Sequence, residues 1–318
     1  MITPHLPTIS RRQFLNAASL ATASLCLAPR QLYAEDVSLV VTIRKVAATA
    51  KIKITKLRGN ISVLEGSGGN IAVLTGRDGK LLVDAGITAT RKGISEALAS
   101  LGAEPIKHLI NSHWHFDHTD GNEWLHSEGA EITAHENTRK HLSVQTRVEG
   151  WNFTFPPSPA GALPAKVFKD ELKLQLNGTT LHLVKYPPGH TDSDISVHFT
   201  DADILLVADT FWNGDYPFID YSTGGSIDGT ILAAELNVAR STNETIVISG
   251  HGPVGNRAQL IAFRDMLVAT RAKVAALKKQ GRSLTEVLAA KPTAAYDEKW
   301  GGSFIDGRTF TGLIYAGV

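Results

Sequence analysis

The sequence predicts an α/β protein with a four-layer αββα sandwich, in which two β-sheets pack face to face and helices cover their outer faces. Short apolar runs bounded by glycine or asparagine alternate with segments of helical periodicity. The strand-rich plan of the first half of the chain also recurs in the second half. Because a sheet with an apolar face must bury it against another layer, two such sheets are expected to form the core.

The first half is expected to begin with hairpins and to continue with β-α-β units. Glycine-rich breaks at 66–70 and 76–79 are typical of hairpin turns. Helical periodicity over 91–101 stops at Gly102, and the next strand, 106–111, leads into a histidine-rich motif. The remaining predicted elements of this half are strands at 54–57, 61–64, 71–75, 81–83 and 131–134, and helices at 121–128 and 136–148.

Residues 151–164 separate the two halves and carry aromatic residues and four prolines without a steady period. This pattern is typical of a long functional loop. Beyond it, Asn177-Gly178 predicts a tight hairpin. The predicted elements of the second half are strands at 172–176, 180–186, 195–199, 204–208 and 245–249, and helices at 231–240, 256–280 and 283–290.

Length and composition indicate one large domain over residues 35–318, with 281–318 as a C-terminal extension of it. The chain has 318 residues, of which 43% are hydrophobic, enough for a sizeable core. Its formal net charge is only +1, with no basic stripe, which argues against a nucleic-acid partner. A small-molecule partner is expected instead. The glycine-rich stretch 300–310 is expected either to cap the domain or to touch a second subunit, so homo-oligomerisation stays open.

The first 34 residues have the features of an export signal. Arg11-Arg12 is followed by Phe14-Leu15 and an alanine-rich apolar stretch, which resembles a twin-arginine signal. Small residues before Glu35 suit cleavage there, although retention as an anchor stays open. The apolar run is too short to span a bilayer comfortably, so we expect no stable membrane insertion. The predicted location is the periplasm.

The run His113-Trp114-His115-Phe116-Asp117-His118 is the most informative part of the chain. Four metal-binding side chains within such a short run cannot all face an apolar core. On an extended backbone the side chains of His113 and His115 point in the same direction, whereas those of Asp117 and His118 point in a different direction because the chain turns. This arrangement suits two adjacent ions. Imidazole and carboxylate ligands favour zinc, and iron or manganese accept the same set.

Three further metal-binding side chains follow strand-like runs elsewhere in the chain. They are His190 and His251, each beside a glycine, and Asp209, which ends the apolar run 204–208. Ligand sites in open α/β sheets gather at the carboxyl ends of the strands. We therefore expect these residues and the histidine-rich run to converge on one rim.

This ordered set of residues resembles the metallo-β-lactamase superfamily, and the resemblance extends from Ile54 to the helix after His251. It implies a site with two zinc ions. By resemblance, the first ion is held by His113, His115 and His190, the second by Asp117, His118 and His251, and Asp209 bridges both. Asp84, which ends the run 80–83, matches an aspartate that supports the ligands from behind.

The expected function is hydrolysis of an ester, lactone, thioester or amide by a hydroxide that bridges the two ions. Asp117 is the expected catalytic residue, because it is best placed to orient that hydroxide. One alternative is a zinc β-lactamase, which Asp209 makes less favoured because the common β-lactamases lack a bridging aspartate there. The other is an iron-dependent oxidoreductase of sulfur-dioxygenase or diiron type. His190 argues against the diiron type, whose members typically carry a carboxylate there.

Aromatic residues in loops beside these motifs are the candidates for a substrate pocket, and they favour an apolar or aromatic substrate. The candidate pocket residues are Phe116, Trp151, Phe153, Trp212 and Tyr216.

Overall fold

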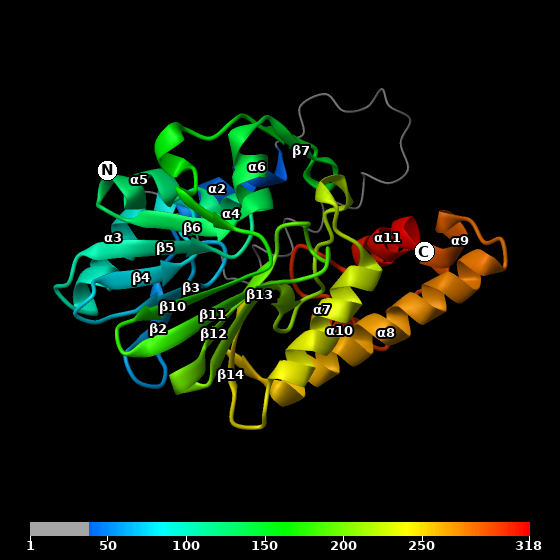
Figure 1. Cartoon of the computed structure of the whole chain (residues 1–318). Helices are drawn as coiled ribbons and strands as arrows, with labels where there is room; N and C mark the ends of the chain where they lie inside the picture. Colours follow the sequence, from blue (N-terminus) through cyan, green and yellow to red (C-terminus); the bar gives the residue numbers. More distant parts are fainter. Residues whose placement is uncertain (1–37) are drawn as a thin grey trace, which may run out of the picture. The chain divides into compact units, whose positions relative to one another are not determined.

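The computed structural model describes residues 38–318, so the expected export signal lies outside the described residues. The described chain forms two compact units. We call residues 38–213 and 219–268 the sandwich unit, and residues 214–218 and 269–318 the C-terminal unit. Figure 1 shows the helices and strands in colours that follow the sequence from blue to red.

The first sheet of the sandwich unit has seven strands in the order β1-β2-β3-β4-β5-β6-β9. Strands β1 to β4 pair antiparallel through short turns, whereas β4, β5, β6 and β9 run parallel. The strands are β1 (Lys53–Lys56), β2 (Ile61–Glu65), β3 (Ile71–Leu74), β4 (Lys80–Val83), β5 (Ile106–Asn111), β6 (Glu131–His135) and β9 (Lys166–Phe168). The expected strands of the first half are therefore present, and β9 is an addition.

The second sheet has six strands in the order β10-β11-β12-β13-β14-β15. Strands β10 to β13 are antiparallel, and β14 runs parallel to β13. The strands are β10 (Glu171–Leu176), β11 (Thr179–Lys185), β12 (Ile195–Phe199), β13 (Ile204–Trp212), β14 (Ile246–His251) and β15 (Gly255–Asn256). All nine residues of β13 are buried, as expected of a strand covered on both faces.

The two sheets share one apolar core, which includes Val63 and Ile110 from the first sheet and Val197 and Leu206 from the second. Helices α3 (Arg91–Ser100) and α5 (Asn122–Ser127) lie over the outer face of the first sheet (Figure 1) and bury Leu98 and Leu125 in a second cluster. On the second sheet, α7 (Ile227–Arg240) and the start of α8 (Arg257–Lys279) cover β13, where the Phe211 and Phe263 rings are 5.2 Å apart. The predicted αββα sandwich is confirmed.

The connection between the halves differs from the prediction, because the helix expected over 136–148 ends early. Helix α6 spans Glu136–Ser143, and the chain then forms a hairpin of β7 (Thr146–Val148) and β8 (Phe153–Phe155). The Thr146 hydroxyl donates to the His141 carbonyl 2.8 Å away and so satisfies the helix end. Valine and threonine around the break favour the strand. Part of the irregular loop expected over 151–164 thus forms the strand β8.

Short elements complete the sandwich unit. Helix α2, for which the sequence pattern gave no prediction, packs Val40 and Ala47 against Phe116 and Ile87. The remaining helical elements are α2 (Leu39–Ala47), η1 (Thr88–Thr90), α4 (Phe116–Thr119), η2 (Glu149–Trp151), η3 (Ala160–Ala162), η4 (Thr200–Ala202) and η5 (Tyr221–Thr223).

The C-terminal unit contains the second part of α8 together with α9 (Leu284–Ala289), α10 (Asp297–Trp300) and α11 (Gly307–Gly317). Helix α10 ends at the start of the glycine-rich stretch 300–310, and α11 begins within it. Asp306 caps α11 by accepting the Thr309 backbone N–H at 2.7 Å. Between residues 38 and 318, no helix is both long and apolar enough to cross a membrane.

Candidate active site

Apart from Asp209, the candidate metal ligands lie at the carboxyl ends of strands or in the segments that follow them. The histidine-rich run directly follows β5 and continues as α4. His190 lies in the turn after β11, and His251 is the last residue of β14. Strands of a sheet that run in the same direction bring such turns to one edge.

Asp209 lies inside β13, where the strand is distorted. The pairing of β13 with β14 shifts register between Leu206 and Ala208, and Ala208 has a φ of 44°, which is unusual for a residue other than glycine. The neighbouring Gly250 leaves the space that the aspartate needs, because a Cβ atom there would lie 1.9 Å from Asp209 Oδ1. The bulge and the glycine together admit the Asp209 side chain at this position.

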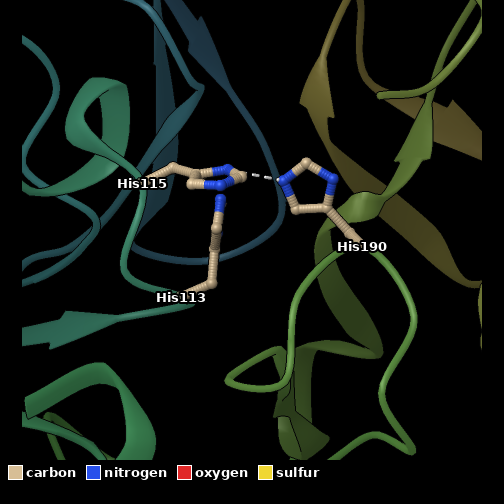
Figure 2. Close-up of side chains that lie close together, drawn as sticks. All are labelled: His113, His115 and His190. Atoms are coloured by element: carbon tan, nitrogen blue, oxygen red, sulfur yellow. Dashed lines mark hydrogen bonds between the residues drawn. The ribbon is translucent and has the colours of Figure 1, made fainter. Parts of the chain in front are cut away.

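His113, His115 and His190 form the first group of candidate ligands, shown in Figure 2. Nε2 of His190 lies 2.8 Å from Nδ1 of His115. The ring of His113 is 4.9 Å from each of the other two rings, measured between centroids. One ligand nitrogen from each side chain lies within 4.8 Å of the others, close enough for one ion to be held by all three.

Asp117, His118 and His251 form the second group. Oδ2 of Asp117 lies 3.3 Å from Nε2 of His251 and 3.7 Å from Nε2 of His118. Asp117 and His118 are neighbours on α4, whereas His251 comes from the second sheet.

Asp209 lies between the two groups. Its Oδ2 atom is 3.4 Å from Nε2 of His190 in the first group and 3.3 Å from Nε2 of His251 in the second. Its Oδ1 atom is 3.0 Å from Nε2 of His118. The structure therefore brings all seven candidate ligands into one cluster, with this carboxylate next to both halves.

The cluster fits divalent cations. Buried polar atoms normally form hydrogen bonds, yet several ligand atoms of this cluster form none of acceptable geometry among the described residues, even where another ligand atom lies close by. These atoms are Nε2 of His113, Nε2 of His118, Nε2 of His251 and Oδ1 of Asp209. Imidazole nitrogen and carboxylate oxygen suit zinc, and also iron or manganese.

The pKa values of the second group also fit a bound cation, because the carboxylates there favour positive charge on their neighbours. Burial acts to lower the pKa of His251, but Asp209 and Asp117 outweigh burial and raise it to about 9. His118 behaves in the same way, and its pKa lies well above the usual histidine value. Burial acts to raise the pKa of Asp209, but the surrounding histidines, His251 first, hold it well below the usual value. In the first group, burial lowers the pKa of His113 and favours the neutral ligand form.

Asp84 supports both groups from behind. Its Oδ2 atom accepts hydrogen bonds from Nδ1 of His118 at 2.8 Å and from the Ser112 hydroxyl at 2.7 Å. The Ser112 hydroxyl oxygen in turn lies 3.0 Å from Nδ1 of His113. Asp84 has a φ of 70°, a conformation that is costly for an aspartate and that is held here by surrounding structure.

Two supporting residues were not predicted from the sequence. Asp220 accepts a hydrogen bond from Nε2 of His115 at 3.0 Å, and Asn70 donates from Nδ2 to the carbonyl oxygens of Ser249 and Gly252, both at 2.9 Å. Both are buried polar residues in turns. Nothing in their local sequence distinguishes them from ordinary turn residues, and only the pairing of distant segments reveals them.

The aromatic candidates occupy different environments. Trp151, between β7 and β8, lies over the first group with its ring 4.6 Å from that of His115. Phe116 is 4% exposed and packs beneath Trp151, and Phe153 is half-buried in the same cluster. The ring of Trp212 is 4.4 Å from that of His251.

Tyr216 is different, because it belongs to the C-terminal unit. It is fully buried there, its ring stacks on Phe310 at 4.6 Å, and its hydroxyl donates to Asp297 at 2.9 Å. These contacts occupy both the ring and the hydroxyl, so the structure gives Tyr216 a packing role within its own unit.

The chain matches the family model of the metallo-beta-lactamase superfamily over residues 64–251. This match spans more than half of the sequence and every candidate ligand, and the chain belongs to this superfamily. A probable metallo-hydrolase of Methanocaldococcus jannaschii is 27% identical over 185 residues, which cover 56% of this chain and 84% of that protein. Family and site together define a metal-dependent hydrolase.

Solved structures share the fold. A metallo-beta-lactamase from Pontibacter korlensis has a TM-score of 0.56 and 18% identity, covering 69% of this chain and 99% of that one. The sec-alkylsulfatase Pisa1 from Pseudomonas sp. has a TM-score of 0.61 and 14% identity. That match covers 87% of this chain but only 51% of the sulfatase, so this chain corresponds to about half of it.

Proposed function

We propose that this protein is a periplasmic hydrolase that holds two zinc ions and cleaves an ester, lactone, thioester or amide bond. The position of Asp209 is the main support for two ions rather than one. A carboxylate whose Oδ2 atom lies 3.4 Å from His190 and 3.3 Å from His251 is placed to serve both groups of ligands. In this proposal the first ion is held by His113, His115 and His190, and the second by Asp117, His118 and His251.

Two zinc ions at this site would supply a water molecule of near-neutral pKa and positive charge that polarises a carbonyl oxygen. The remaining chemistry depends on the protein side chains. Asp117 Oδ2 borders the cluster, and the side chain is 14% exposed, whereas Asp209 is only 3% exposed. Asp117 is therefore the carboxylate that a water molecule can reach, and we assign it the orientation of that water and the acceptance of its proton.

The exposed side of the cluster also indicates how substrate approaches. His251 is 21% exposed and Asp117 14%, whereas His118 and His190 are almost completely buried. Substrate is thus expected to approach from the side of Asp117 and His251. Trp151 and Trp212 flank the two groups of ligands, which favours an acyl or leaving group with apolar or aromatic surface.

A sulfate ester is a second candidate substrate class, because the similar sec-alkylsulfatase shares the fold over most of this chain. β-Lactams are a third class, suggested by the metallo-beta-lactamase neighbours. Periplasmic location rests on the twin-arginine motif at residues 10–15, outside the described structure.

Elemental analysis of protein purified without added metal tests the proposal first. Two zinc ions per chain are expected, whereas iron would redirect the assignment to redox chemistry. Zinc-loaded protein should then hydrolyse at least one member of a panel of p-nitrophenyl esters, lactones, thioesters and amides. The panel also includes an alkyl sulfate and a chromogenic β-lactam. Cleavage of the sulfate alone or of the strained β-lactam alone would overturn the preference for esters, lactones, thioesters and unstrained amides.

A further inference from the structure

Asp220 links two of the three candidate ligands of the first group. Its Oδ2 atom accepts the Nε2–H of His115 at 3.0 Å, and its backbone N–H donates to the His190 carbonyl oxygen at 2.9 Å. His115 follows β5 of the first sheet, and His190 follows β11 of the second. A single residue thus contacts ligands that come from both sheets.

The Asp220 carboxylate is itself firmly held. It is 1% exposed, and Oδ2 also accepts the Thr223 hydroxyl at 2.6 Å. Oδ1 accepts the backbone N–H of Ser222 at 3.1 Å as well as the Ser222 hydroxyl. A buried carboxylate is costly unless its oxygens are satisfied, and here all its contacts fix the direction in which Oδ2 meets His115.

This contact determines which nitrogen of His115 is available. With the proton on Nε2 directed at Asp220, the lone pair of Nδ1 faces Nε2 of His190 at 2.8 Å. A carboxylate behind a ligating histidine orients the ring and increases the basicity of the other nitrogen. Figure 2 shows the resulting arrangement, in which the three imidazole rings converge.

We propose that Asp220 is a positioning residue for the first ion site, through its paired contacts to His115 and to the backbone of His190. This inference rests on the two-ion assignment of the proposed function. It gives the first site a support of its own in addition to Asp84, which bonds directly to His118 of the second site and reaches His113 of the first only through Ser112.

The test compares Asp220→Ala and Asp220→Asn with the unaltered protein. Asp220→Ala removes the acceptor, whereas Asp220→Asn keeps an oxygen that can accept from Nε2 but removes the negative charge. Asp192→Asn is a matched control, since Asp192 accepts a hydrogen bond from His141 at 2.7 Å and neither residue belongs to the candidate ligands. Zinc binding is measured by competition with a chromophoric chelator, and cobalt(II) absorption reports on ligand geometry.

Asp220→Ala is expected to lower the affinity for one of the two ions by about 10–100-fold and to leave the affinity for the other unchanged. Asp220→Asn should lie between the alanine variant and the unaltered protein, and Asp192→Asn should bind both ions normally. Normal affinity for both ions in either Asp220 variant would overturn the inference. If circular dichroism shows that the alanine variant is unfolded, the result for the asparagine variant alone decides. Equal weakening of both ions would also overturn it. If the unaltered protein binds fewer than two ions, the proposed function fails instead.

Discussion

The Nδ1 atom of His118 lies 2.8 Å from the Oδ2 atom of Asp84, a residue held in a left-handed backbone conformation with a φ of 70°. The strand β4 ends directly before Asp84, so the strained residue places its carboxylate behind the ligands instead of continuing the strand. Strain of this kind persists only where surrounding structure stabilises it, and it is often found at functional sites.

Replacing this carboxylate should weaken metal binding. In Asp84→Asn, we expect the affinity for the ion at His118 to fall by about 10–100-fold, because the ring loses its charged acceptor. Chelator competition measures the change. Asp78→Asn is the control at the other end of β4, where Asp78 accepts the Asn177 backbone N–H at 2.7 Å. Equal zinc affinity in the two variants would refute the supporting role.

Asp117 is expected to be essential for turnover but not for folding. Asp117→Ala should lower kcat by about 10²–10⁴-fold through loss of proton acceptance and water orientation, while far-ultraviolet circular dichroism stays unchanged. Asp120→Asn is the control, because Asp120 follows the same short helix but pairs with Arg44 at 2.7 Å. Activity in Asp117→Ala that matches this control would rule out the assigned role.

Gly69 leaves the space that His118 occupies. A Cβ atom at Gly69 would lie 2.1 Å from Cε1 and 2.5 Å from Nε2 of the His118 ring. Gly69→Ala should therefore displace His118, weaken zinc binding and destabilise the fold by about 1–3 kcal/mol. Gly302→Ala, where nothing lies within 4 Å of the added atom, is the control. A Gly69→Ala protein with normal zinc affinity would show that the ring tolerates the methyl group.

Zinc binding should release protons. The pKa of His251 is raised to about 9, burial acting against the shift and Asp209 and Asp117 driving it, so the side chain is protonated at neutral pH in the absence of metal. A ligating nitrogen must be deprotonated, so binding displaces this proton and zinc affinity should increase from pH 7 towards pH 9. Calorimetry in buffers of different ionisation enthalpy counts the protons. Binding at pH 7 without proton release would contradict this charge state.

Trp151 should influence substrate affinity more than the chemical step. Its ring lies 4.6 Å from that of His115, at the turn of the β7–β8 hairpin. For an apolar substrate, Trp151→Ala is expected to lower kcat/KM by about 5–30-fold, mainly through KM, which corresponds to one or two kcal/mol of lost contact. Val144→Ala, at an exposed position before the hairpin, serves as the control. An unchanged KM for every apolar substrate in the panel would remove Trp151 from the pocket.

The sequence was sufficient to predict most of the sandwich, because its strands are short apolar runs with clear glycine or asparagine breaks. Strands β5 and β12 begin and end at the predicted residues. The β7–β8 hairpin was not predicted, since its three-residue strands are too short to show a period and its partner contacts decide its structure. Helix α11 was obscured by the glycines that precede it.

The candidate ligands were predictable because metal-binding residue types recur after strand-like runs. The residues that support the ligands, Asp220 and Asn70, could not be predicted in this way. Asp220 and Asn70 act through hydrogen bonds to residues 105 positions and about 180 positions away in the sequence, and a single turn residue carries no local sign of such a partner. Tyr216 was expected near the substrate from its position after Trp212. Its ring stacks on Phe310 within the C-terminal unit, and a contact with substrate stays a prediction.

Anomalous diffraction at the zinc absorption edge, from crystals of the protein purified without added metal, tests the central assignment most directly. We predict two peaks, one among His113, His115 and His190 and one among Asp117, His118 and His251, with Asp209 between them. A single peak, or no zinc signal in the cluster, would contradict the two-ion account.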